Sequence, residues 1–297
     1  MNRLLLASLT LLALGACSQD AASPPAPAAS TPAPVAAADQ PAQVTPPASA
    51  NDLFATRLDE TLGGAWRSDA NKARDAWRHP KETLTFFGIA PGQTVIEITP
   101  GGGWYTEILA PWLKDSGTYV AAIAAPASSD YAKRGAEAFR AKLAGDAERY
   151  GQTQVVEFDP AAPVLGPAGS ADVVLTFRNV HNWRDNAPAM FKAFFDVLKT
   201  GGTLGVVDHR AAVGTDLDAD RQSGYLPQDY VIRLATEAGF QLAAQSEINA
   251  NPKDTKDYEK GVWTLPPTLA LGDVDREKYQ AIGESDRMTL KFVKPAQ

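Results

Sequence analysis

A run of β-branched residues followed by an acid and three glycines constrains the fold of this chain most strongly. The run is 94–98, with Glu97 inside it, and the glycines are Gly101, Gly102 and Gly103. A buried strand that turns sharply into a helix has this pattern. Glycine lacks Cβ, so a ligand can approach the backbone of such a turn closely. The first amides of the following helix also have no partner within that helix. We therefore expect a ligand at this turn.

The same strand begins a regular alternation of short apolar runs and amphipathic segments. Strands separated by helices and short loops favour a parallel sheet covered on both faces, with right-handed crossovers. The fold class predicted is a doubly wound α/β sheet of about seven strands, with an N-terminal helical cap. The strands are expected at 94–98, 118–123, 153–158, 171–177, 203–208, 240–247 and 287–293. The last two are expected to form a late hairpin that departs from the alternation. Helices are expected at 81–87, 104–113, 129–149, 188–198, 227–238 and 276–283.

Two segments allow more detailed expectations. The helix at 129–149 should bury a stripe of Tyr131, Ala138, Phe139 and Leu143. The charged stretch from Asn249 to Lys260 is expected to be a solvated loop. The alternative is a lid over a binding site, with Trp263 as its apolar anchor and Tyr225 lining the pocket.

The N-terminal part of the chain divides into two pieces that precede the expected domain at 51–297. Residues 1–17 have a basic start, a short apolar run and Cys17 at the end. They resemble a bacterial lipoprotein signal, in which Cys17 is lipidated and anchors the protein in a membrane. Ser18 follows, which implies the outer membrane facing the periplasm. Residues 18–50 are rich in Ala and Pro and are expected to be a disordered tether.

Composition limits the partners and the means of stabilisation. The net charge is −7 and the isoelectric point is near 5.1. A nucleic-acid-binding protein usually has a basic face, so we expect no nucleic acid as the main partner. Cys17 is the only cysteine, so the fold depends on its hydrophobic core rather than on a disulfide. The sequence gives no oligomeric state.

The order of these elements resembles the class I S-adenosylmethionine-dependent methyltransferases over about residues 80–295. Residues 95–103 stand where that superfamily has its first strand, an acid and a Gly-x-Gly-x-Gly turn. Asp159, just after the third strand, stands where a family acid contacts the adenine amino group. Residues 172–179 match the strand-four motif, and 198–202 match the turn before strand five.

Further matches extend the resemblance towards the C-terminus. Residues 238–240 match the Ala-Gly-Phe that opens strand six, and the late hairpin would supply the family's antiparallel strand. More narrowly, 178–183 and 283–288 resemble a group of bacterial predicted methyltransferases. The resemblance implies a Rossmann-like fold, S-adenosylmethionine as cofactor and a small-molecule or envelope component as methyl acceptor. The cofactor-binding residues that it implies are Glu97, Gly101, Gly102, Gly103, Asp159, Arg178 and Asn179.

Two positions depart from the superfamily pattern. Thr99 and Pro100 stand at the start of the turn, where the family has its first glycine. The second strand has no acid at its end to hold the ribose hydroxyls, and the next acid is Asp130. A catalytically inactive, lipid-anchored binding protein with the same fold therefore stays open as an alternative. For Glu97 itself, a role in ordering the turn is the alternative to cofactor binding.

Polar residues follow strands four and five, whose ends should lie at one edge of the sheet. His181, Asp208 and His209 are the candidate catalytic residues. His181 could act as a general base, because its unperturbed pKa lies near neutrality. A structural network is the alternative. The same three residues could also ligate a metal, so a metal-assisted hydrolase is a third candidate function. No close pair of histidines supports that option, and no metal is expected.

Overall fold

The computed structural model describes residues 49–218 and 221–296. The predicted signal sequence with its lipidation site Cys17, and the predicted tether up to residue 48, lie outside the described residues. Within this described part, no helix is long and apolar enough to cross a membrane.

The folded part begins slightly earlier than predicted. Helix α1 (Ala50–Gly63) starts with Ser49 as its N-cap, whose hydroxyl accepts a hydrogen bond from the amide of Asp52. The Asp52 carboxylate accepts the Ser49 amide in return. This reciprocal pair satisfies two amides that a helix start leaves open. Residues 49 and 50 therefore belong to the domain and not to the tether.

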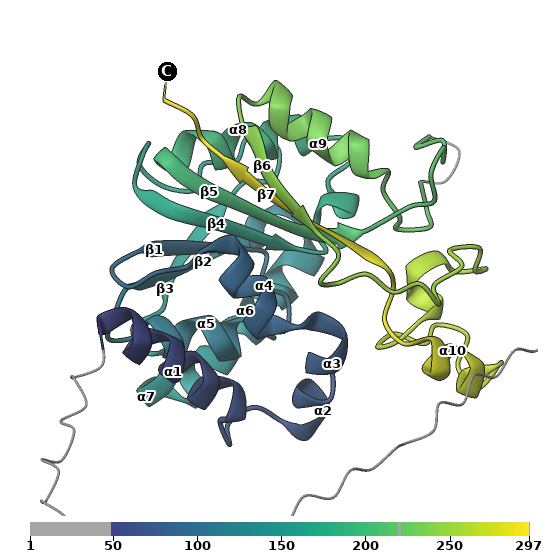
Figure 1. The fold of residues 1–297 in the computed structure, drawn as a ribbon, viewed down its shortest axis with the longest axis horizontal. Helices are drawn as coiled ribbons and strands as arrows, with labels where there is room; N and C mark the ends of the chain where they lie inside the picture. The colour runs from purple at the N-terminus through teal and green to yellow at the C-terminus, as the bar shows by residue number, and fades with distance from the viewer. Residues whose placement is uncertain (1–48, 219–220, 297) are drawn as a thin grey trace, which may run out of the picture. The chain divides into compact units, whose positions relative to one another are not determined.

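The described residues form a seven-stranded sheet in the order β3-β2-β1-β4-β5-β7-β6 (Figure 1). Pairing is parallel from β3 through β5, and β7 is antiparallel to both β5 and β6. The predicted doubly wound fold, with an antiparallel strand inserted beside β5, is confirmed. The strands are β1 (Thr94–Ile98), β2 (Thr118–Ala124), β3 (Gln154–Phe158), β4 (Ala171–Phe177), β5 (Leu198–His209), β6 (Gln241–Ser246) and β7 (Arg287–Val293).

Strand β5 begins earlier than predicted. Its first residue, Leu198, pairs with Ala171 of β4, and the register shifts between there and Val173. The amide of Gly201 donates to the carbonyl of Lys294. The glycine pair that was expected to precede the strand is therefore part of it.

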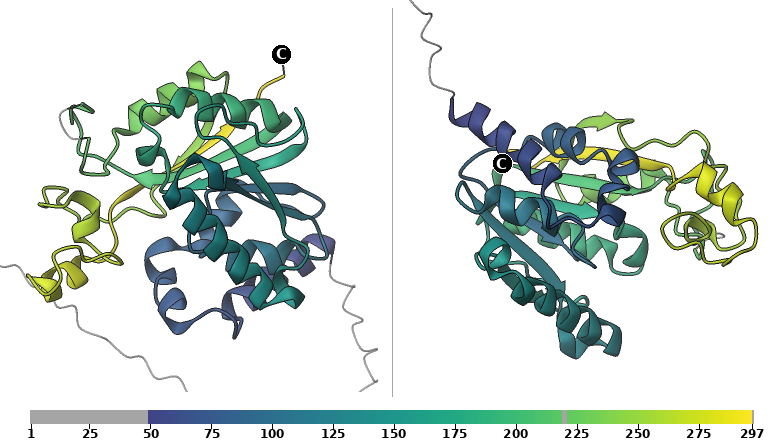
Figure 2. Two further views of the ribbon diagram at one scale, coloured as in Figure 1. Left: turned by 180° about the vertical axis from the view of Figure 1, so that it is seen from behind. Right: turned by 90° about the horizontal axis from the view of Figure 1, so that it is seen from below.

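Helices cover both faces of the sheet (Figures 1 and 2). Helices α8 and α9 pack on one face, and α1, α4, α5 and α6 pack on the other. The remaining helical bounds are α2 (Asp69–Lys72), α3 (Asp75–Arg78), α4 (Pro80–Phe87), α5 (Thr106–Leu113), α6 (Asp130–Gly145), α7 (Ala147–Tyr150), α8 (Ala187–Val197), α9 (Gln228–Glu237) and α10 (Arg276–Ile282). Short 3-10 turns are η1 (Pro126–Ser128), η2 (Val180–Asn182) and η3 (Gly261–Thr264).

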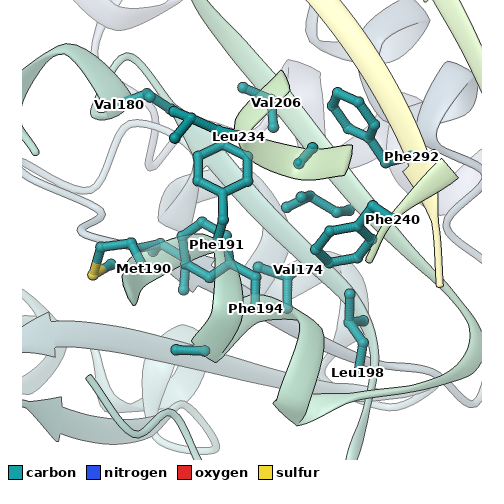
Figure 3. Close-up of a cluster of buried hydrophobic side chains, with 14 of the residues drawn as sticks. Val174, Val180, Met190, Phe191, Phe194, Leu198, Val206, Leu234, Phe240 and Phe292 are labelled. Carbon is teal, nitrogen blue, oxygen red and sulfur yellow. The ribbon is translucent and has the colours of Figure 1, made fainter. Parts of the chain in front are cut away.

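The core beneath α8 includes several aromatic side chains. Phe191 and Phe194 are fully buried, with ring centroids 5.5 Å apart. They face Val174 of β4 and the aromatic side chains of Phe240 and Phe292 (Figure 3). Burying side chains of this kind stabilises the fold by roughly 1.5–3 kcal/mol each. The fold therefore rests on apolar packing, as a chain with one cysteine requires.

The predicted helix at 129–149 is wrong in two respects. It divides at Asp146, whose carboxylate caps α7 by accepting the Arg149 amide. Its predicted stripe is also rotated, because Tyr131 is 82% exposed while Ala132 and Phe139 are buried. Positions i, i+4 and i+7 from 132 lie on one helix face. The large aromatic ring at 131 misleads a choice based on hydrophobicity alone.

Candidate functional site

The glycine turn after β1 leaves room for a ligand. Gly101 has φ of 60° and Gly103 has φ of 77°. A Cβ on Gly101 or Gly102 would meet no heavy atom of the described residues within 4 Å. A Cβ on Gly103 would come within 2.8 Å of the Lys142 side chain. The first two glycines are therefore the open part of the turn, and Lys142 covers the third.

The two residues that replace the family's first glycine still produce the turn. Thr99 adopts φ of 50°, in the left-handed region that glycine normally occupies. The turn also displaces the helix start, because α5 begins at Thr106 and not at 104 as predicted. Trp104 and Tyr105 lie between the glycines and the helix. Both are buried, and Tyr105 stacks on Phe177 at 3.6 Å between ring centroids.

Glu97 lies inside the domain and not on the surface of the turn. It is 2% exposed, and its Oε2 accepts hydrogen bonds from Tyr119 at 2.5 Å and from Thr106 at 3.3 Å. Burial raises the pKa of Glu97 to about 7. The hydrogen bonds from the two hydroxyls lower the pKa and offset only part of this rise. These contacts join β1, β2 and the first residue of α5. They favour the ordering role that the sequence left open for this acid.

The acids that follow β2 and β3 are exposed, and one of them, Asp159, is a predicted cofactor residue. Strand β2 ends at Ala124, and Asp130 is an exposed residue at the start of α6. Asp159, just after β3, is also exposed, and its carboxylate accepts the amide of Ala161 at 2.9 Å. The carboxylate of Asp159 is therefore accessible from solvent at the end of β3, although it already accepts one backbone amide.

Asp208 organises the ends of β4 and β5. It is fully buried, and its Oδ2 accepts the amide of Val180 at 2.7 Å. Its Oδ1 lies 2.9 Å from His181 Nδ1 and accepts the amide of His209 at 2.8 Å. A carboxylate that receives three N–H groups is an acceptor for charge-assisted bonds. The three candidate catalytic residues are thus together, as predicted.

The two histidines have different surroundings. The Asp208 carboxylate is a hydrogen-bond acceptor, so the His181 tautomer that bonds to it carries its proton on Nδ1. In that tautomer Nε2 is the basic nitrogen of His181. His209 Nδ1 is bonded to Ser285 Oγ. Burial, together with the nearby charges of His181 and Arg287, holds the pKa of His209 well below its usual range. His209 is therefore neutral at pH 7. The two rings lie 5.0 Å apart between centroids.

The structure brings the candidate metal ligands together as well. One ligand atom from each of His181, Asp208 and His209 lies within 4.8 Å of the others. The rings of His181 and Trp263 pack edge to face, with 6.0 Å between their centroids. Asp208 orients His181 in the same way that a carboxylate orients a metal-bound histidine.

Arg178 and Asn179 connect the two halves of the edge. Asn179 is buried, and its amide nitrogen donates to the carbonyl of Ile98 at 2.9 Å and, more weakly, to that of Thr99 at 3.4 Å. Arg178 has φ of 60°, and its Nη1 lies 3.7 Å from Glu284. The side-chain amide of Asn179 therefore supports the glycine turn from the end of β4.

Several residues at this edge had no role in the sequence-based prediction. Glu284 is the shared partner of four arginines, and Ser285 bonds His209. The run 283–288 carried the narrow family resemblance, which was the one available signal. Nothing in its spacing indicates that it meets residues of α3, because the contacts depend on β7 lying beside β5.

The charged stretch from Asn249 to Lys260 is only partly the solvated loop that was expected. Asn249, Asn251 and Asp254 are buried. Asp254 accepts hydrogen bonds from Tyr225 at 2.9 Å and from the amide of Asp286 at 2.7 Å. The lysines at 253 and 260 are exposed, as a solvated loop predicts. The buried acid and amides hold this segment against the start of β7.

Two cavities in the described residues lie away from this edge. One of about 340 Å³ is lined by Lys114, Thr118 and Gln154, among others, at the starts of β2 and β3. The other, of about 650 Å³, is lined by Phe195 and Lys294, among others. Ligands of open α/β sheets bind at the opposite, carboxyl ends of the strands. We therefore base the candidate site on the polar edge and not on these cavities.

Comparison with protein-family models gives no match, and comparison with curated protein sequences gives none either. Solved structures do match. An S-adenosylmethionine-dependent methyltransferase from Aquifex aeolicus is 13% identical with a TM-score of 0.50, covering 81% of this chain and 98% of that one. The [4+2]-cyclase SpnF is 17% identical with a TM-score of 0.52, covering 84% and 97%.

A third match is phosphoethanolamine N-methyltransferase 2 from Haemonchus contortus, in complex with S-adenosyl-L-methionine. It is 15% identical with a TM-score of 0.51, covering 80% of this chain and 60% of that one. At these identities the matches concern the fold. This chain therefore has the fold of the class I S-adenosylmethionine-dependent methyltransferases, as its sequence motifs predicted.

Proposed function

We propose that this protein is an S-adenosylmethionine-dependent methyltransferase that acts on a small-molecule or envelope acceptor. The observation that carries the proposal is the position of the His181–Asp208 pair. It lies at the ends of β4 and β5, beside an open glycine turn, in a sheet with methyltransferase topology.

The turn fits a cofactor that approaches the backbone closely. Gly101 and Gly102 have open space where a Cβ would be, and the exposed carboxylate of Asp159 can accept a hydrogen bond in addition to that from the Ala161 amide. These residues would hold the cofactor, whose sulfonium supplies an electrophilic methyl group. Asn179 stiffens the turn by binding the Ile98 carbonyl. Holding donor and acceptor in line supplies most of the rate of such a reaction.

His181 is the proposed general base. Asp208 fixes the Nδ1–H tautomer, so Nε2 can take a proton from an acceptor hydroxyl or amine. His209 stays neutral because burial lowers its pKa, and it adds no competing positive charge beside His181. The pair thus provides one proton acceptor at a defined atom.

The predicted location is part of the proposal. We propose that Cys17 is lipidated and anchors the domain in the cell envelope, facing the periplasm. The acceptor would then be an envelope component or a small molecule that reaches the envelope. Cys17→Ser should move the protein from the membrane fraction into the soluble fraction of cells that export it.

A binding protein without methyl transfer is the second candidate. Glu97 directs Oε2 to Tyr119 and Thr106, and β2 ends without an acid for the ribose hydroxyls. A [4+2]-cyclase shares the fold, and fold alone does not fix the chemistry. A metal-assisted hydrolase is the third candidate, favoured only by the proximity of His181, Asp208 and His209.

Calorimetric titration with S-adenosylmethionine and S-adenosylhomocysteine tests the cofactor. We expect both to bind with one site per chain. Gly102→Leu should abolish binding, because its side chain fills the open space without requiring an unusual φ. Gly135→Leu is the matched control, since Gly135 is also open but lies on the exposed face of α6. No heat at millimolar ligand would remove the methyltransferase proposal in favour of the binding protein.

Transfer of a labelled methyl group to a cell-envelope extract tests the base. Asp208→Asn should reduce the transfer rate by about a hundredfold or more, because an amide can stabilise the wrong His181 tautomer. Cofactor affinity should be unchanged. Asp196→Asn is the control, since Asp196 forms an exposed pair with Lys192. A hydrolytic activity that needs no S-adenosylmethionine and that a chelator removes would favour the hydrolase instead.

A further inference from the structure

Four arginines meet a single glutamate at the edge of the sheet. Glu284 lies 2.7 Å from Arg74 Nε, 3.1 Å from Arg78 Nε and 3.0 Å from Arg287 Nη1. Arg178 is more distant, at 3.7 Å. We call these four residues the arginine cluster. Among the described residues, none of the four has an ion pair with any other acid.

The arginine cluster carries more positive charge than Glu284 neutralises. Four guanidinium groups and one carboxylate leave a surplus of three positive charges. Arg78 and Arg287 are inner residues, with side chains 2% and 3% exposed. Arg74 and Arg178 are outer residues, at 23% and 26%. Burying unneutralised charge is costly unless an anion compensates it.

Arg78 has hydrogen-bond donors that the described residues leave unused. Its Nη1 and Nη2 are both buried and have no partner in the part of the chain that the structure describes, while its Nε is bonded to Glu284. The guanidinium carbon lies 4.7 Å from the centroid of the Trp104 ring. An aromatic face attracts the cation but accepts no strong hydrogen bond. A ligand oxygen would satisfy donors that otherwise cost free energy.

The position of the arginine cluster places it next to the proposed site. Arg178 directly follows β4, and Trp104 follows the glycine turn. Ser285, adjacent to Glu284 in the chain, bonds His209. A ligand held by the cluster would therefore lie between the turn and the histidines.

We propose that the arginine cluster binds a phosphate group. A carboxylate carries one negative charge, whereas a phosphate monoester carries nearly two at neutral pH and offers three acceptor oxygens. The larger charge matches the surplus of three better, and arginine forks pair with phosphate in bidentate geometry. This assignment holds whether or not methyl transfer occurs. If the proposed function holds, the phosphate belongs to the acceptor.

Titration of the whole protein with inorganic phosphate and with glycerol 3-phosphate tests the proposal. We expect both to bind at one site, and acetate to bind at least tenfold more weakly. Arg78→Met and Arg178→Gln should each weaken phosphate binding about ten- to hundredfold, because each removes charge-assisted bonds. Arg178→Gln alters an outer residue, so it serves if Arg78→Met does not fold. Vesicles that contain phosphatidic acid separate a lipid headgroup from a soluble phosphate ester.

Two controls separate this site from the cofactor site. Arg67→Met should leave phosphate binding intact, since Arg67 is equally buried and lies over the same Trp104 ring but pairs with Asp75. Gly102→Leu should also leave it intact while removing cofactor binding. Phosphate that fails to bind, or that S-adenosylhomocysteine displaces, would overturn the assignment. Displacement would identify the cluster as the subsite for the cofactor's own carboxylate.

Discussion

The two halves of the sheet's carboxyl edge contain buried acids in opposite surroundings. At β1, Glu97 receives bonds from two hydroxyls. At β5, Asp208 receives three N–H groups, one of them from His181. Hydroxyl dipoles do not offset the burial of Glu97, and its pKa rises to about 7. The β1 half therefore supplies space and an internal contact, while the β4–β5 half supplies the polar groups for chemistry.

The largest expected effect comes from a substitution beside the polar β4–β5 half of the edge. Glu284→Gln leaves the arginine cluster without its carboxylate, and removing one partner of a buried ion pair typically costs about 3–5 kcal/mol. We expect the free energy of unfolding to fall by that amount in urea denaturation. Glu247→Gln is the control. Glu247 pairs with Arg210, but its side chain is 69% exposed, so this substitution should cost under about 1 kcal/mol. Equal losses of stability for the two variants would show that the ion pairs of Glu284 contribute no more than an exposed ion pair.

Phosphate gives a second measure of the same variant. If the arginine cluster binds phosphate, saturating phosphate should restore part of the stability that Glu284→Gln loses, by mass action. If phosphate leaves the stability of Glu284→Gln unchanged, surplus positive charge is not the cause of the lost stability.

The next effect sharpens the contrast between the two acids. The pKa of Glu97 is about 7 in the folded protein and near 4.5 in the unfolded chain. The folded state therefore binds the proton more tightly, and this group's contribution to stability falls as pH rises from about 4.5 to 7. The shift corresponds to about 3 kcal/mol.

Glu97→Gln removes this titration. The stability of the wild type relative to the variant should drop by about 3 kcal/mol between pH 4.5 and pH 8, measured by denaturation at each pH. Glu157→Gln is the control, since Glu157 is exposed. A difference that stays constant with pH would mean that folding does not raise the pKa of Glu97.

The smallest effect concerns the turn itself. Thr99→Gly should stabilise the domain by about 1 kcal/mol, because glycine adopts the φ of 50° without a Cβ penalty. Thr118→Gly in β2 should have the opposite sign, since glycine in a strand loses more conformational entropy. Thermal unfolding of both variants measures the pair. A loss of stability at both positions would show that the Thr99 side chain contributes more than its strained backbone costs.

The strands of the sheet could be predicted from the sequence because each strand is marked by residues that lie close together in the chain. Runs such as 94–98 and 171–177 are short and β-branched, and glycines mark their ends. His181 and Asp208 could be placed together because strand ends meet at one edge of a parallel sheet. The same reasoning could not say that Glu97 turns towards Tyr119, because alternation in a strand buried on both faces does not distinguish the faces.

The arginine cluster could not be predicted for a different reason. Arg74 and Arg78 lie in a region of short helices, and Glu284 lies in a loop before β7. Neither segment has a periodic pattern that indicates a partner. The buried Asn249 and Asp254 were missed similarly, since a run of polar residues normally indicates solvent exposure. Contacts of this kind depend on the tertiary arrangement that the insertion of β7 creates.

The insertion of β7 between β5 and β6 also affects the order in which the two halves form during folding. The partners of Glu97 lie 9 and 22 residues away in the chain, whereas Arg74 and Glu284 are 210 residues apart. Closing a long loop costs more entropy, and contacts between distant segments form slowly. We infer that the hydroxyl contacts of Glu97 form early and that the arginine cluster is completed last. An unfolded chain would thus regain its hydrophobic layers before it could bind an anion.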